Sequence, residues 1–450
     1  MTDLPVRANL ATEPLGLRKV VETARQNLLE IIPELATRQP MVSGRMIRRW
    51  HMVMDPPALR RVLLEKAKDY PKSEVVKNVL GPVIGDSLFL AEGRNWLWQK
   101  RAASPVFSSR NISALGPVMS ASAARMVERL NGAQSRVVDM HEEFTAATFE
   151  VISDVMFAGQ GTIDRTVAAR AIDIYVARSA RTSVLDIIGA PSWFPRFGRL
   201  LPAREVRQLK SVADNAIRRR RLAGRSNGND LHDLLAAAQD PKTGRRMSPQ
   251  ELRDNLLTFV VAGHETTALA LSWALYLLAY DHSWQERLRE EVCSVIGGEP
   301  AHADDLERMP CTIRVLKEAL RLYPPAGLIL RTALVEDQLG GREVRPGDTI
   351  LMPIYALHRN QCLWERPDEF DPDRFLEPNE IDRFQYLPFG GGPRSCIGSN
   401  FAMQEAGILL STLLANFRFS LIPERPPKPV LILTMRPEGG VWLECTRVQN

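Results

Sequence analysis

Cysteine is scarce in this chain: its 450 residues include five, Cys293, Cys311, Cys362, Cys396 and Cys445. They are odd in number and widely spaced, and no two of them form a C-x-x-C pair. This pattern argues against a disulfide framework and against a structural zinc site. We therefore expect the protein in a reducing compartment, the cytoplasm.

A long apolar run free of polar and charged residues is also missing. Residues 256–280 are long enough to span a bilayer, but His264 and Glu265 lie in their middle, where charge is costly in lipid. Just upstream, Ser248 and Glu251 have the spacing of a helix-capping box. The segment therefore predicts one long helix buried through the middle of a large domain.

Neither sign of charge dominates. Lys and Arg number 58 and Asp and Glu 53, which gives a net charge of +5 with neutral histidine. The one dense basic run, Arg218–Arg221, has no interleaved aromatic residues, so we expect no nucleic-acid partner. A mildly basic surface suits an acidic protein partner instead. Residues 1–18 lack the apolar core of a signal peptide, and we expect no membrane anchor.

Helical spacing recurs through most of the chain as far as Tyr323. The clearest helical segments are residues 58–64, 119–130, 144–157, 206–222, 254–279 and 312–322. Strand-like segments are short, at residues 332–334, 349–352, 417–421 and 431–435, with hairpin turns expected at 340–341 and 346–348 and a turn at 159–161. No repeat or linker divides the chain, so the sequence predicts a single domain, mainly α with a minor β part.

The most specific stretch runs from Phe389 to Gly398 and contains three consecutive glycines, a proline and Cys396. These residues favour a tight, irregular loop that leads into a helix at 400–414. Backbone N–H groups at a helix start lower the pKa of a thiol, so Cys396 can be a nucleophile or a metal ligand. The alternative is an inert buried cysteine on a glycine-rich turn.

This stretch resembles, position for position, the haem-thiolate loop F-x-x-G-x-R-x-C-x-G of the cytochrome P450 family. The resemblance implies haem b with the Cys396 thiolate as the axial ligand of its iron. It also implies that Phe389 shields the sulfur, that Arg394 reaches an anionic group beside the metal, and that Gly398 completes the loop. The expected fold is one cytochrome P450-like domain over residues 1–450, with 1–30 as a loosely packed N-terminal segment.

Two further motifs support the resemblance, in the order in which the family has them. Glu318 and Arg321 are similar to the E-x-x-R helix, and Tyr323 and two prolines end that helix. Arg374 lies in a segment similar to the P-x-R-F element. The resemblance implies that these three charged residues form a buried structural network, and removing one member strands its partners.

Residues 262–266, Ala-Gly-His-Glu-Thr, fit the pattern (A/G)-G-x-(D/E)-T of the family's long helix. The resemblance implies that Glu265 and Thr266 relay protons to dioxygen. Gly263 is expected to let the flat cofactor approach the backbone, and Thr266 to bond back to a carbonyl. A zinc-protease motif is excluded because position 268 is alanine.

Two haem propionates need cations. Trp96 and Lys100 form W-x-x-x-K where the family has W-x-x-x-R, and Arg101 is adjacent. Lysine can neutralise a carboxylate but lacks the guanidinium fork. The resemblance implies that three cations, Lys100, Arg331 and Arg394, balance the two propionates.

The expected reaction is insertion of one oxygen atom of O2 into a hydrophobic organic substrate, by hydroxylation or epoxidation. Only about fifty residues follow Cys396 and no nucleotide-binding fingerprint is present. Electrons are therefore expected from NAD(P)H through a separate acidic ferredoxin or flavodoxin and its reductase. Lys100, Arg101, Arg110 and Arg394 are candidates for steering it to a monomeric enzyme.

Apolar residues are candidates for the substrate pocket: Val83, Leu88, Phe259, Val260, Leu328, Ile329 and Val441. They indicate an apolar substrate such as a fatty acid or terpenoid, or are simply core residues. Two other functions stay open: a peroxide-driven haem peroxygenase, and a haem-based ligand sensor or carrier without turnover. Both leave the pair Glu265–Thr266 without a clear use.

Overall fold

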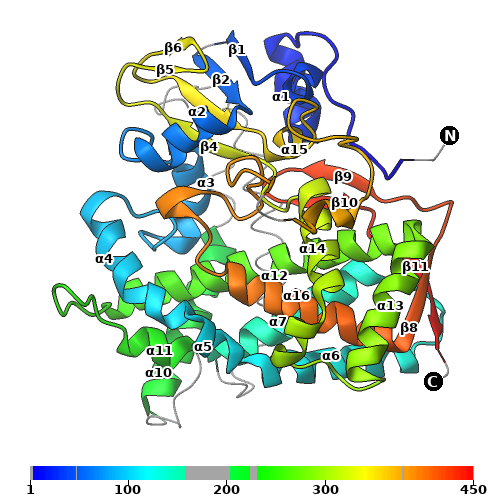
Figure 1. Cartoon of the computed structure of the whole chain (residues 1–450). Helices are drawn as coiled ribbons and strands as arrows, with labels where there is room; N and C mark the ends of the chain where they lie inside the picture. Colours follow the sequence, from blue (N-terminus) through cyan, green and yellow to red (C-terminus); the bar gives the residue numbers. More distant parts are fainter. Residues whose placement is uncertain (1–3, 47, 158–202, 223–230, 378–379, 449–450) are drawn as a thin grey trace.

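The computed structural model describes residues 4–46, 48–157, 203–222, 231–377 and 380–448, and the turn expected at 159–161 lies outside them. The fold is mainly helical (Figure 1). Its helices are α1 (Leu17–Ala24), α2 (Pro56–Arg60), α3 (Glu74–Ile84), α4 (Gly93–Ala103), α5 (Ser109–Ser113), α6 (Gly116–Gly132), α7 (Met140–Phe157), α10 (Ala203–Leu222), α11 (Leu231–Ala237), α12 (Pro249–Tyr280), α13 (His282–Ile296), α14 (Pro310–Leu322), α15 (Ile354–Leu357) and α16 (Ser399–Asn416).

The expected long central helix is α12, which is 32 residues long. Ser248 caps it: its hydroxyl accepts a hydrogen bond from the backbone N–H of Glu251, and the Glu251 side chain accepts one from the backbone N–H of Ser248. Most of its side chains are buried, because α7, α14 and α16 pack around it (Figure 1). This arrangement confirms the mainly helical fold class.

The strands form small sheets at the edges of the helical body. A four-stranded sheet has the order β1 (Met41–Arg45), β2 (Arg49–Val53), β7 (Thr349–Met352) and β4 (Ile329–Thr332), with β2 and β7 parallel. An antiparallel sheet has the order β3 (Val137–Asp139), β11 (Trp442–Arg447) and β8 (Phe417–Leu421). Two hairpins complete the set, β5 (Asp337–Leu339) with β6 (Arg342–Val344) and β9 (Lys428–Leu431) with β10 (Met435–Glu438).

The strand predictions hold in part. The segments 349–352 and 417–421 are strands, and 340–341 is a hairpin turn. The single strand predicted at 431–435 is wrong, because the chain reverses there between β9 and β10. Residues 346–348 form a turn but join β6 to β7, which do not pair with each other, so the second hairpin prediction is also wrong.

The N-terminal segment is tied to the helical body by three tyrosines. The backbone N–H of Val6 donates to the Tyr276 hydroxyl at 3.0 Å, and the Tyr323 hydroxyl donates to the Val6 carbonyl at 2.7 Å. The Ala8 N–H donates to the Tyr355 hydroxyl at 3.0 Å. The segment that the sequence analysis expects to be loosely packed therefore makes specific contacts with the body.

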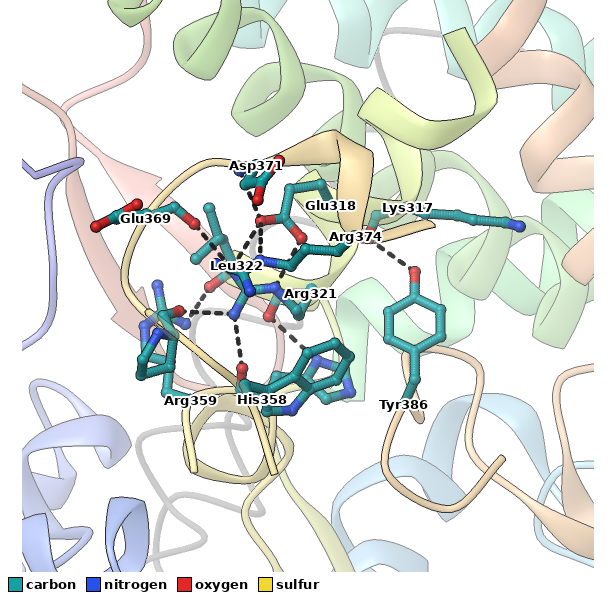
Figure 2. A network of polar contacts seen from close by, with 12 residues as sticks. Lys317, Glu318, Arg321, Leu322, His358, Arg359, Glu369, Asp371, Arg374 and Tyr386 are labelled. Atoms are coloured by element: carbon teal, nitrogen blue, oxygen red, sulfur yellow. Dashed lines mark hydrogen bonds and ion pairs between the residues drawn. The ribbon is translucent and has the colours of Figure 1, made fainter. Parts of the chain in front are cut away.

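A buried charge network joins α14 to the chain that precedes Cys396 (Figure 2). The side chains of Glu318 and Arg321 are both 0% exposed, and Nε and Nη2 of Arg321 each donate to the Glu318 carboxylate at 2.7 Å. Arg374 Nε lies 3.4 Å from Glu318 Oε1. The Arg321 guanidinium also donates to three backbone carbonyls, those of His358, Pro367 and Glu369.

His358 carries this network to the cysteine loop. Its Nδ1 lies 3.1 Å from the Arg321 carbonyl, and its Nε2 lies 2.9 Å from the backbone N of Leu387. Burial first, and then the Arg321 charge, lower the pKa of His358 to about 3. The neutral ring with its proton on Nδ1 satisfies both contacts, so Leu387, two residues before Phe389, is held by the network.

Replacing Glu318 by alanine leaves the Arg321 charge buried without its main partner. We expect Glu318→Ala to lower the free energy of unfolding by about 3–5 kcal/mol. Urea denaturation followed by circular dichroism measures the change.

The matched control is Glu22→Ala, which removes an exposed partner of Arg18. An exposed pair contributes less than about 1 kcal/mol. Equal losses of stability in the two variants would contradict the structural role of the buried pair.

Candidate active site

The loop before α16 is shaped by glycine. Gly390 and Gly392 have φ angles of +68° and +66°. A Cβ atom on Gly392 would lie 1.9 Å from the carbonyl oxygen of Leu63, so no other residue fits. The backbone N–H of Cys396 donates to the Phe389 carbonyl at 2.8 Å, which closes the loop. Cys396 is thereby held three residues before α16.

The Cys396 side chain is accessible at the surface of this loop, yet enough protein surrounds the sulfur to influence its ionisation. Burial raises the pKa of the Cys396 thiol above its ordinary value, and the backbone N–H of Gly398 acts in the opposite direction. The expected lowering of the thiol pKa is therefore wrong in its net direction. A thiolate at this position needs a positive charge at the sulfur, which a metal ion supplies.

One turn in the middle of α12, the open turn, is less buried than the rest of the helix. Ala262 is exposed and Thr266 is partly exposed, although most of the helix is buried. The Thr266 hydroxyl donates to the Ala262 carbonyl at 2.7 Å, the back-bond expected from the sequence. Since α16 begins directly after the cysteine loop and packs against α12, the open turn and Cys396 lie on neighbouring elements.

Glu265 is held by the C-terminal hairpin. Its carboxylate Oε1 lies 2.5 Å from Arg436 Nε and accepts a hydrogen bond from the Thr434 hydroxyl at 2.8 Å. The Glu265 side chain is 8% exposed and that of Arg436 is 31% exposed. Neither partner is predictable from a local sequence pattern, because each lies about 170 positions away from Glu265 in the chain.

Gly263 has a packing explanation in this structure. A Cβ atom on Gly263 would lie 3.3 Å from Cδ1 of Ile152 on α7. The glycine therefore lets α7 and α12 approach closely. The contact between Gly263 and a flat cofactor stays a prediction.

Cations crowd around one carboxylate beside the cysteine loop. Arg394 Nη2 donates to Glu92 Oε2 at 2.5 Å, and Arg394 Nη1 is buried with no hydrogen-bond partner among the described residues. Arg331 is 8% exposed, and burial and then Arg394 lower its pKa to about 10. Lys72 is also buried; burial, followed by Arg331 and Arg394, lowers its pKa well below the ordinary value. The sequence analysis missed Lys72, whose backbone forms an isolated bridge with Arg331.

Trp96 and Lys100 also lie beside the cysteine loop. The Arg394 guanidinium is 4.1 Å from the centre of the Trp96 ring, and Lys100 Nζ is 5.3 Å from it. Lys100 Nζ donates to the carbonyl of Pro393. The cations proposed from the sequence therefore gather around Trp96 and the cysteine loop, and Lys72 adds to them.

Arg101 is paired with Asp240 and does not join the cations beside the cysteine loop. Its Nε and Nη2 donate to the two carboxylate oxygens of Asp240, each at 2.6 Å. Asp240 is fully buried, and the hydrogen bonds from Arg101 hold the pKa of its carboxyl below the usual range. Lys100 is thus the cation of this helix that remains beside Arg394.

The predicted pocket residues fall into three sets that differ in their surroundings. Ile329 lies beside the loop, with its Cδ1 3.8 Å from a Cβ position on Gly390, and Leu328 is partly buried next to it. Val83, Leu88 and Val260 are buried. Phe259 packs on Phe107 with ring centres 5.0 Å apart, and Val441 is fully buried with its backbone bonded to the start of α7. A pocket role for the last two has less support than their role in the core.

A helical fold around a long buried helix, with a glycine-shaped cysteine loop and a crowd of buried cations, defines a class of protein built to hold a metal-centred anionic cofactor. The Cytochrome P450 family model matches residues 16–443. The chain therefore belongs to the cytochrome P450 family, whose members are haem-thiolate monooxygenases.

Relatives and a solved structure agree with this assignment. Cyclooctatin synthase of Streptomyces melanosporofaciens is 33% identical over 85% of this chain and 83% of its own length. Putative cytochrome P450 132 of Mycobacterium tuberculosis is 32% identical over 88% of this chain and 87% of its own. The crystal structure of the cytochrome P450DA heme domain superposes with a TM-score of 0.81 and 27% identity, covering 97% of this chain and 94% of that one.

The family's cofactor fits the residues present. Haem offers an iron to a cysteine sulfur and two carboxylates to cations, and this site has an accessible Cys396 and buried cations in excess of Glu92.

Among the described helices, none has both the length and the apolar character that crossing a membrane requires.

The shape of the loop predicts the effect of a single methyl group. Gly392→Ala combines a positive φ with a clash against Leu63, whereas Gly439→Ala has a φ of +85° and open space around its Cβ. We expect the Gly439 variant to lose about 1–2 kcal/mol from backbone strain alone. The Gly392 variant should lose clearly more stability and also most of its bound haem.

Denaturation and the haem absorbance per polypeptide measure the two effects. Equal stability and equal haem content in both variants would show that the close approach of Gly392 to Leu63 does not shape the loop.

Proposed function

We propose that this enzyme binds haem b with Cys396 as the axial ligand and inserts one oxygen atom of O2 into a hydrophobic substrate. The observation that carries the proposal is the pairing of an accessible cysteine at a helix start with buried cations that exceed their one carboxylate. Bound haem supplies the activation of dioxygen and the oxidation of the substrate.

Each group of residues has a proposed role around the cofactor. Lys72, Lys100, Arg331 and Arg394 neutralise the two propionates, and the Trp96 ring packs against two of these cations, Lys100 and Arg394. Phe389 shields the sulfur, and the N–H of Gly398 donates to it. The propionates supply negative charge to the four cations, and the iron supplies positive charge to the Cys396 sulfur. The charges of the site are therefore balanced only when the cofactor is bound.

Glu265 and Thr266 carry protons to the open side of α12. The Thr266 hydroxyl donates its hydrogen to the Ala262 carbonyl, and its oxygen can accept a hydrogen bond from a water molecule and hold that water for proton transfer. Glu265 is held at the hairpin by Arg436 and Thr434. Proton transfer from Glu265 therefore requires either that its carboxylate leaves these partners or that a water molecule bridges it to Thr266. Arg436 is partly exposed and connects this path to solvent.

The substrate is proposed to be apolar, because the candidate pocket residues near the loop are aliphatic. The similarity to cytokinin hydroxylase of Arabidopsis thaliana, which is 33% identical over 80% of this chain, supports hydroxylation as the reaction. Electrons are proposed to come from NAD(P)H through an acidic ferredoxin or flavodoxin and its reductase. Exposed Arg110 is a candidate to steer that partner; a cytoplasmic location and a monomer stay predictions.

The ligand of the iron is tested by the spectrum of the reduced protein under carbon monoxide. We expect the main absorption band at the position of thiolate-ligated haem. In Cys396→Ser this band should be lost, because the serine hydroxyl does not replace the thiolate. A band at the position of histidine-ligated haem, or protein without any pigment, would overturn the proposal.

The relay is tested by Thr266→Ala in the enzyme supplied with a surrogate ferredoxin system. We expect NADPH consumption to continue while product per NADPH falls by roughly tenfold or more, because proton delivery is lost. The control is Thr258→Ala, which removes another back-bonded threonine of the same helix. Unchanged product yield per NADPH in the Thr266 variant would exclude the relay role of Thr266.

A further inference from the structure

Glu92 is the acidic residue among the cations beside the cysteine loop, and the function described above gives it no role. It is the N-cap residue of α4, a position where a side-chain oxygen commonly accepts a hydrogen bond from the first helical turn. The Glu92 side chain makes no such hydrogen bond. Its carboxylate contacts Lys72 and Arg394 instead, so it serves these cations and not the helix that follows it.

The two carboxylate oxygens of Glu92 have different partners. Oε2 accepts a hydrogen bond from Nη2 of Arg394 at 2.5 Å, and Oε1 accepts one from the backbone N–H of Lys72 at 3.2 Å. Only Oε2 therefore bonds to a positively charged group. The Glu92 side chain is 34% exposed and that of Arg394 is 14% exposed, so water reaches the carboxylate as well.

Within the described part of the chain, no second carboxylate forms an ion pair with these cations. Nη1 of Arg394 is buried without a hydrogen-bond partner. The Lys72 ammonium lies over the Phe89 ring, 3.3 Å from its centre, and Nη1 of Arg331 donates to the Leu330 carbonyl at 3.1 Å. One carboxylate thus faces several positive charges that repel one another.

The effect of Glu92 on its neighbours has one sign. Burial first, and then the neighbouring cations, lower the pKa of Lys72 and of Arg331, and Glu92 raises both. Burial also lowers the pKa of Arg394, and Glu92 again acts in the opposite direction. Glu92 therefore stabilises the charged forms of all three cations. A ligand that brings its own carboxylates to them meets a negative charge that is already in place.

We propose that Glu92 is a resident counter-ion of Lys72, Arg331 and Arg394, and that it competes with the carboxylates of the cofactor for these cations. This proposal rests on the haem site of the proposed function. Its consequence is that Glu92 weakens the hold on haem and, as a nearby negative charge, favours the oxidised form of the iron. A residue that only oriented Arg394 would have the opposite effect, because its loss would weaken haem binding.

The competition is tested by the rate at which the holoenzyme loses haem to an excess of apomyoglobin. We expect Glu92→Gln to lose haem roughly fivefold more slowly than the wild type, because one like charge beside the propionates is removed while the side-chain size is kept. Damage to the fold accelerates haem loss, so a slower rate does not arise from misfolding. The matched control is Glu74→Gln, which removes an exposed carboxylate paired with Lys77 and should keep the wild-type rate.

Two further measurements identify the effect as electrostatic. The difference in haem loss between the wild type and Glu92→Gln should shrink in about 1 M salt, because salt screens a partly exposed carboxylate. The reduction potential of the bound iron should be higher in Glu92→Gln than in the wild type, since the carboxylate no longer favours the oxidised form. Glu74→Gln should change neither quantity.

Haem loss from Glu92→Gln at the wild-type rate or faster would overturn the competition. A reduction potential equal to that of the wild type would overturn the effect of the Glu92 charge on the iron. Each protein is first checked for the thiolate-type band under carbon monoxide. A wild type without this band contradicts the proposed function, whereas a wild type with the band and an unchanged rate in Glu92→Gln contradicts only the role of Glu92.

Discussion

The bidentate ion pair between Glu318 and Arg321 is the interaction on which the geometry of the active site depends. Both side chains are fully buried, so their desolvation must be offset by complete hydrogen bonding. Arg374 and backbone carbonyls supply the remaining partners. Through the neutral ring of His358 the network holds the backbone N–H of Leu387. A pair of charges on α14 thus sets where the cysteine loop begins.

The cations beside that loop show the opposite electrostatic situation, an excess of buried charge of one sign. The pKa of Arg331 is lowered to about 10 by burial and by Arg394. A shift of this size corresponds to about 3 kcal/mol acting against the charged form. Glu92 offsets only part of this repulsion, because Lys72 and Arg394 share the same region. An anionic cofactor would remove this cost, so the cluster couples stability of the fold to cofactor binding.

The features that could be predicted from the sequence are those with a local pattern. The capping box of Ser248 and Glu251 begins α12 where expected, and the glycines of the cysteine loop adopt the tight turn they favour. The contacts that could not be predicted join distant segments. Arg436 beside Glu265 and the approach of Lys72 to Arg331 follow from sheet and loop packing that no short motif encodes.

Two buried carboxyl groups, one on α12 and one on α16, have different surroundings. Glu265, on α12, is paired with Arg436, whose side chain is 31% exposed. Glu405, on α16, is 1% exposed, neither of its carboxyl oxygens has a hydrogen-bond partner within the described part of the chain, and burial raises the pKa of its carboxyl well above the ordinary value. Because α16 begins directly after the cysteine loop and packs against α12, this pair of helices positions Cys396 relative to the turn of α12 that carries Glu265 and Thr266.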